Sequence, residues 1–185
     1  MKQGFVKVAS ATPGIRVADP VYNAQVICEQ AKEAAEHGAK IVVFPELCIT
    51  GYTCNDLFLQ ELLLEKAKEA LLTIAEETGQ LETLFLVGLP VDKDGRLYNV
   101  AAVLYRGRIL GMIPKKNIPM YAEFYEGRHF TPGEETVTEY RLGKQVIPFG
   151  SNLLFRCEEL PELILGCELC EDLWVAEPPS TSHAL

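Results

Sequence analysis

The amino-acid sequence predicts an α/β fold in which helices flank a mixed sheet, and three observations support this prediction. Two long segments, 23–37 and 56–78, place apolar residues at helical spacing. Short apolar runs rich in β-branched residues, such as 40–44 and 84–91, alternate with them. Glycine-containing turn signals then join further short runs, as at 92–95. Helices that alternate with buried strands must pack on a sheet to cover their apolar faces.

The first half of the chain supplies both long helices. Asp19 followed by Pro20 is typical of a helix start, because an acidic cap and a proline in the first turn suit that position. Gly38 and Gly79 end the two helical segments. The strand at 40–44 runs into Pro45 and Glu46, which places Glu46 at its carboxyl edge.

The second half is mostly strands and one irregular region. Residues 114–133 show no clean period and contain three prolines and two glycines, which is typical of an active-site loop. The expected strands are 4–9, 40–44, 84–91, 98–105, 108–113, 144–147, 153–157 and 163–167.

Composition limits the classes of protein. With 185 residues, 48% hydrophobic and 23% charged, the chain suits one globular domain spanning 1–185. The net charge of −9 disfavours binding to nucleic acid. No run of about 18 apolar residues predicts a membrane span, and the first residues do not resemble a signal peptide. We therefore expect a cytoplasmic protein with six reduced cysteines.

Three segments carry candidate chemistry. In FPELCITGY, Glu46 follows a buried strand, and a partly desolvated carboxylate there can accept a proton. In IPKKNIPMYAEFYEG, Lys115 or Lys116 could stabilise an oxyanion, although a solvated pair of surface lysines is the simpler interpretation. In LILGCELCEDLW, Cys170 lies in the turn after a strand, where a thiol can face a pocket together with backbone N–H groups.

Other interpretations of Cys170 stay open from the residues alone. Cys167 and Cys170 form a C-x-x-C, but a structural zinc site needs a second ligand pair, so we expect no metal. A cysteine–histidine hydrolase would have to use His129, which has no obvious orienting partner. A buried, inert Cys170 is the more serious alternative.

Taken together and in this order, the three segments resemble the nitrilase (carbon–nitrogen hydrolase) superfamily. The stretches FPELCITGYTCNDLF, PKKNIPMYAEFYEGRHFTPG and CELCEDLWVAEPPS are most similar to the amino-terminal glutaminase domain of glutamine-dependent NAD synthetases. The resemblance covers nearly the whole chain. It implies an α-β-β-α sandwich, and because such domains are longer than this chain, a nitrilase-like unit that is incomplete at its carboxyl side.

The resemblance also implies the roles of individual residues. Glu46 would be the general base, Lys115 the oxyanion-stabilising lysine and Cys170 the nucleophile. Four further residues would line or organise the pocket: Tyr52, Tyr121, Glu123 (a second glutamate that helps to hold the lysine) and Glu171 (through its backbone N–H).

The implied reaction is hydrolysis of the glutamine side-chain amide through a cysteine thioester. Ammonia would pass to a synthetase domain that is not in this chain and that uses ATP and Mg to amidate nicotinic acid adenine dinucleotide to NAD. No cofactor is expected in this chain, and exposed apolar sheet would favour a homo-oligomer. The alternatives are a free-standing amidase of the same superfamily and a non-catalytic fragment that acts only in assembly.

Overall fold

The computed structural model describes residues 4–185, and a seven-stranded mixed sheet forms its centre. The strands are β1 (Val8–Ser10), β2 (Ile41–Val43), β3 (Leu84–Lys93), β4 (Arg96–Tyr105), β5 (Arg108–Pro114), β6 (Thr138–Leu142) and β7 (Gln145–Phe149), with β8 (Phe155–Arg156) and β9 (Ile164–Leu165) in a separate ribbon. The helices are α1 (Pro20–Glu36), α2 (Glu61–Glu77) and α3 (Pro179–His183), with 3-10 segments η1 (Tyr52–Leu59), η2 (Glu126–Arg128) and η3 (Cys170–Leu173).

The sheet combines parallel and antiparallel pairs in the order β1-β2-β3-β4-β5-β7-β6. Strands β1, β2 and β3 run parallel, β3, β4 and β5 form an antiparallel meander, and β7 pairs parallel to β5 and antiparallel to β6. The predicted α/β class with a mixed sheet is confirmed. Strand β6 and helix α3 were not expected, and the strands predicted at 153–157 and 163–167 shorten to two residues each.

Two tight turns join the meander as the sequence predicts. Asp94 and Gly95 have φ values of 50° and 74°, and Arg106 and Gly107 have 47° and 75°. Two successive residues with positive φ are what a two-residue hairpin of type I′ requires. This long meander brings the first half of β4 next to the last residues of β5, at the edge of the site described below.

Helix α1 begins where the sequence predicts, whereas α2 does not. The carboxylate of Asp19 accepts a hydrogen bond from Tyr22 N at 3.1 Å and caps α1. Helix α2 was expected from residue 56 but begins at Glu61. Residues 52–59 instead form 3-10 turns, since Asn55 has a φ of 49° that no α-helix accommodates.

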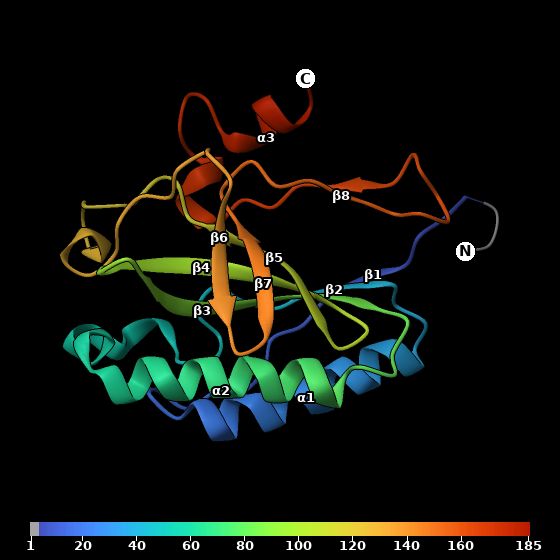
Figure 1. Cartoon of the computed structure of the whole chain (residues 1–185), viewed down its shortest axis with the longest axis horizontal. Coiled ribbons are helices and arrows are strands. Elements are labelled where there is room, and N and C mark those ends of the chain that lie inside the picture. Colours follow the sequence, from blue (N-terminus) through green and yellow to red (C-terminus); the bar gives the residue numbers. More distant parts are fainter. Residues whose placement is uncertain (1–3) are drawn as a thin grey trace.

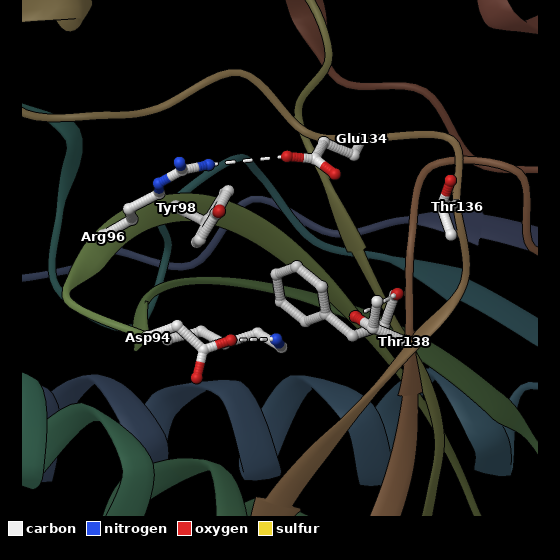
Figure 2. A pocket seen from close by; sticks show the side chains of 8 residues that line it. Asp94, Arg96, Tyr98, Glu134, Thr136 and Thr138 are labelled. Carbon is white, nitrogen blue, oxygen red and sulfur yellow. Dashed lines mark hydrogen bonds and ion pairs between the residues drawn. The ribbon is translucent and has the colours of Figure 1, made fainter.

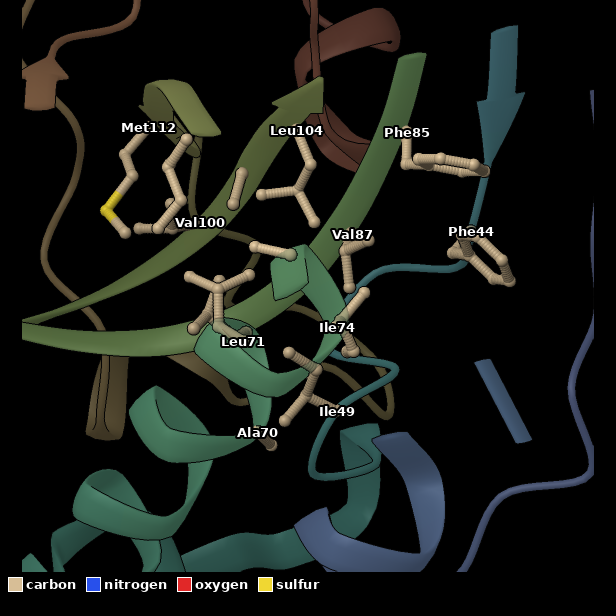
Figure 3. Packing of buried hydrophobic residues seen from close by; sticks show 14 of the residues in the cluster. Phe44, Ile49, Ala70, Leu71, Ile74, Phe85, Val87, Val100, Leu104 and Met112 are labelled. Carbon is tan, nitrogen blue, oxygen red and sulfur yellow. The ribbon is translucent and has the colours of Figure 1, made fainter. Parts of the chain in front are cut away.

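The main core lies between the sheet and the two long helices. Helices α1 and α2 lie side by side along one face of the sheet (Figure 1). Leu71 and Ile74 of α2 face Val87 and Val100 of the sheet, and all four are fully buried (Figure 3). Burial of apolar surface contributes about 25 cal/mol per Å², so this layer stabilises the fold. No helix among residues 4–185 is long and apolar enough to cross a membrane.

The other face of the sheet is covered by the last part of the chain. Because side chains alternate along a strand, Val100 of β4 points to the helices, while Ala101 and Val103 point away from them. Those two residues pack in a second cluster with Ile113 and Leu169. Strand β8 and helix α3 lie on this side (Figure 1), so residue 170 is delivered to the face opposite the helices.

Candidate active site

Glu46 lies in a turn directly after β2, held tightly against β3. The absence of a side chain at Gly88 permits this contact: a Cβ there would lie 2.3 Å from Leu47 N and 2.9 Å from the carbonyl carbon of Glu46. Ile49 N also donates a hydrogen bond to Gly88 O at 3.1 Å. The side chain of Glu46 is 18% exposed, so its carboxylate is shielded but reachable.

Lys115 follows the last residue of β5 and is fully buried. Lys115 N donates to Asn99 O at 2.8 Å, which continues the β4–β5 ladder by one residue. Its Nζ lies 2.7 Å from Oε1 of Glu46 and 2.7 Å from Oε1 of Glu126. Burial by itself would lower the pKa of Lys115, but the charges and hydrogen bonds of the two carboxylates outweigh it and raise the pKa. The ammonium therefore stays protonated.

The glutamate that holds the lysine is Glu126, and the expectation that Glu123 does so is wrong. Glu126 is 5% exposed and also accepts a hydrogen bond from the Tyr52 hydroxyl at 2.9 Å. Glu123 lies on the surface. Ala122 has a φ of 51°, and this bend, together with the 3-10 turn that begins at Glu126, turns the later glutamate inward. Two glutamates three residues apart in an aperiodic loop offered no pattern for choosing between them.

Sequence reasoning also missed Asn99, which lies on β4 beside the lysine. Its Nδ2 donates to Oε1 of Glu46 at 2.6 Å and reaches Oε2 of Glu126 at 3.4 Å. Asn99 is fully buried. A polar residue within an otherwise apolar strand, on the same face as Ala101, was the signal that could have identified it.

Cys170 is exposed and sits at the start of η3 with a φ of 43°. Left-handed backbone is uncommon outside glycine and often marks functional positions. Local desolvation raises the pKa of the Cys170 thiol, the carboxylate of Glu46 raises it further, and the Lys115 ammonium opposes both. The thiol thus lies within the field of both groups and is protonated at neutral pH. Burial raises the pKa of Cys167 to about 12, which makes that thiol unreactive.

Asp172 ties the cysteine loop to the lysine loop. This carboxylate is 2% exposed and accepts hydrogen bonds from Leu169 N at 3.0 Å, Asn117 N at 2.7 Å and Asn117 Nδ2 at 2.9 Å. Lys116 N donates to it as well, at 3.2 Å. One buried side chain therefore fixes the distance between the segments that carry Lys115 and Cys170.

The remaining expected residues are distributed around this cluster. The Tyr121 hydroxyl donates to the Glu171 carboxylate at 2.8 Å on the exposed rim. Lys116 pairs with Glu135 near the surface, away from the two carboxylates, so the structure places Lys115 and not Lys116 in the cluster. His129 contacts Asp56 at 3.0 Å instead of a cysteine. Within residues 4–185, no group of His, Cys, Asp or Glu is arranged to hold a metal ion.

A hollow of about 320 Å³ lies elsewhere, between the β3–β4 turn and β6. Its charged side chains are already paired: Arg96 lies 3.4 Å from Glu134 (Figure 2), and Lys93 lies 2.5 Å from Asp94. Tyr98 lines it, and Tyr98 points to the opposite face of β4 from Asn99. This hollow is therefore separate from the cluster around Lys115.

Comparison with known proteins supports a single family. The sequence pattern of the family described as carbon-nitrogen hydrolase matches residues 7–181. A glutamine-dependent NAD(+) synthetase from Mycobacterium tuberculosis is 40% identical over 184 residues, which cover 100% of this chain and 27% of that protein. The corresponding protein from Thermotoga maritima is 32% identical over 185 residues, or 28% of its length. This chain thus spans little more than a quarter of these relatives.

Solved structures agree with the sequence comparison. A glutamine-dependent NAD(+) synthetase from Cytophaga hutchinsonii superposes with a TM-score of 0.82 at 29% identity, covering 90% of this chain and 28% of that one. An amidase from Nesterenkonia sp. superposes with a TM-score of 0.59 at 24% identity, covering 77% of this chain and 54% of that one. The second similarity extends to the fold alone.

Proposed function

Because the chain belongs to the carbon–nitrogen hydrolase family, we propose that it is a glutaminase unit that hydrolyses the side-chain amide of glutamine through a thioester on Cys170. The observation that carries the proposal is the position of Lys115. Its buried ammonium lies 2.7 Å from the carboxylates of both Glu46 and Glu126, and the buried Asp172 carboxylate ties the loop of Lys115 to the loop of Cys170. A base, a cation and a nucleophile in one place are the minimum for acyl transfer.

The first step forms the thioester. Glu46 accepts the thiol proton of Cys170, and the resulting thiolate attacks the amide carbon of glutamine. The carbonyl oxygen takes up negative charge as the tetrahedral intermediate forms. Lys115 and the backbone N–H of Glu171 stabilise that oxyanion, and loss of one such donor costs about 10²–10³ in rate. The raised pKa of Lys115 supports this role, since the ammonium stays charged.

Collapse of the intermediate completes the first step: Glu46 returns its proton to the departing nitrogen, and ammonia leaves as the thioester forms. In the second step Glu46 takes a proton from a water molecule, which attacks the thioester carbon. The Cys170 sulfur leaves, Glu46 gives that proton to it, and glutamate and the free thiol are released. Tyr52 and Tyr121 would line the pocket that receives the substrate; their hydroxyl groups are held by Glu126 and Glu171 respectively.

The ammonia would be consumed by a synthetase unit. The relatives whose matching segment this chain resembles are named glutamine-dependent NAD(+) synthetases, and the segment is 27% of the Mycobacterium tuberculosis protein. We therefore place ATP and Mg in that separate unit, where ammonia amidates nicotinic acid adenine dinucleotide. The part of the reaction proposed for this chain is the hydrolysis of the glutamine amide.

Covalent labelling tests the proposal directly. The chain is incubated with a diazoketone analogue of glutamine, and the modified peptide is identified by mass spectrometry. We expect one adduct on Cys170, protection by excess glutamine, and no adduct in Cys170→Ser. Cys167→Ser is the matched control and should label like the wild type. Protection by short aliphatic amides but not by glutamine would favour a general amidase, and no adduct at all would favour a non-catalytic role.

A further inference from the structure

Asn99 makes an unusual set of contacts for a buried asparagine. Its Nδ2 donates to one carboxylate at 2.6 Å and reaches a second at 3.4 Å, whereas its Oδ1 has no partner among residues 4–185. An unpaired buried carbonyl reduces stability, so a residue present only to stabilise the fold would pair both ends. The amide is instead oriented by its two acceptors, Glu46 and Glu126.

The two donors to Glu46 converge on a single oxygen. Lys115 Nζ lies 2.7 Å from Oε1 and Asn99 Nδ2 lies 2.6 Å from the same atom. No hydrogen bond from the described part of the chain reaches Oε2 of Glu46. An oxygen that already accepts two charge-assisted or short hydrogen bonds is a poor proton acceptor, whereas its unoccupied partner remains basic.

We propose that Asn99 is a positioning residue that, together with Lys115, occupies Oε1 of Glu46 and thereby reserves Oε2 as the atom that exchanges a proton with Cys170. This inference rests on the proposed function, in which Glu46 is the base. In the exchange the S–H bond of Cys170 breaks, its electron pair stays on sulfur, and the proton bonds to Oε2. The geometry of β4 serves this role, because Asn99 lies directly across the ladder from Lys115.

The effect of losing Asn99 follows from its donor. Without Asn99 Nδ2, Oε1 of Glu46 keeps only the hydrogen bond from Lys115, so one donor no longer fixes how the carboxylate is turned. The charged and titratable groups that act on this site come from every neighbouring element: Lys115 after β5, Glu126 in η2, Tyr52 in η1, and Cys170 with Glu171 in η3.

The test measures the rate at which iodoacetamide alkylates Cys170 as a function of pH, with the modified peptide followed by mass spectrometry. This readout needs no glutamine turnover. We expect alkylation at neutral pH to be about tenfold slower in Asn99→Ala, because the carboxylate that accepts the thiol proton is no longer held in place. The two rates should converge at alkaline pH, where the Cys170 thiol, whose pKa is raised by local desolvation, ionises without a base. If that variant does not fold, Asn99→Leu removes the donor at similar volume and should slow alkylation in the same way.

A matched control separates positioning from folding. Asn23 is equally buried and donates two hydrogen bonds, but to the backbone carbonyls of Arg16 and Ile49. Asn23→Ala should lower the melting temperature and leave the pH profile in place. Wild-type alkylation rates at neutral pH in both Asn99 variants would overturn the inference. A wild-type profile in Glu46→Gln would instead overturn the proposed function, because Glu46 would then not be the base.

Discussion

Replacing Gly88 by alanine should displace Glu46, the base of the proposed reaction, without a change to its side chain. A Cβ at Gly88 would lie 2.3 Å from Leu47 N, 2.8 Å from Pro45 O and 2.9 Å from the carbonyl carbon of Glu46. All three are backbone atoms, which cannot rotate away as a flexible side chain can. Since ordinary contacts lie at about 3.5 Å, the turn must retreat from β3 by about 1 Å.

Two magnitudes follow from this displacement. Overpacking of a well-packed site costs about 1–3 kcal/mol of unfolding free energy. For a domain of 185 residues, each kcal/mol lowers the melting temperature by about 2–4 °C, so Gly88→Ala should melt about 2–12 °C below the wild type. A shift of about 1 Å in a reacting group can reduce the rate about 100-fold, which sets the expected loss of Cys170 labelling by the glutamine analogue.

Thermal unfolding and covalent labelling are measured on the same preparations. Gly14→Ala is the control, because a Cβ at Gly14 meets no atom within 4 Å and its backbone is not left-handed. That variant should match the wild type in both assays. The reasoning fails if Gly88→Ala melts with the wild type and labels at the wild-type rate.

Three further predictions concern charged residues. Lys115→Met should reduce labelling of Cys170 at least about 100-fold, because it removes the buried cation. Lys116→Met loses only an ion pair near the surface and should label at the wild-type rate. Equal losses in the two variants would contradict the assignment of Lys115 as the oxyanion-stabilising lysine. Asp172→Asn should slow the labelling of Cys170, because a neutral amide accepts the four hydrogen bonds to this side chain less well than a carboxylate does. An unchanged labelling rate would show that Asp172 does not position the lysine loop against the cysteine loop. Hydrogen bonds from Arg128 and then His129 lower the pKa of Asp56. The ionised carboxylate should therefore stabilise the fold above the ordinary aspartate pKa of about 4 and lose that contribution as the pH falls further. The difference in melting temperature between wild type and Asp56→Asn should narrow below about pH 4, and a constant difference would refute this prediction.

The parts of the fold that local chemistry decides were predictable from the sequence. The Asp19 cap set the start of α1, and the Asp94-Gly95 pair set the first hairpin, because few residue types satisfy those positions. The start of α2 was not predictable, since the helical spacing continues across Asn55 and only the tertiary packing of η1 imposes its left-handed backbone. Strand β6 depends on its pairing with β7 and has weak alternation of its own.

The same distinction between local sequence and tertiary contacts applies to the residues of the candidate site. Glu46 and Cys170 follow strands, so their placement at an edge could be inferred from position in the chain. Glu126 lies in an aperiodic loop, where nothing local distinguishes it from Glu123. Asn99 could be assigned to β4 from the pattern, but its partnership with Glu46 joins residues 53 apart and exists only once the sheet is formed.

The left-handed backbone at Cys170 has a consequence for the evolution of such a chain. A residue with a Cβ at a φ of 43° carries about 1–2 kcal/mol of strain that glycine would not. Cys170→Gly would therefore melt higher than the wild type while lacking the proposed nucleophile. Selection for stability and selection for the proposed turnover would then favour different residues at this position. A screen for thermostability alone would be expected to replace Cys170.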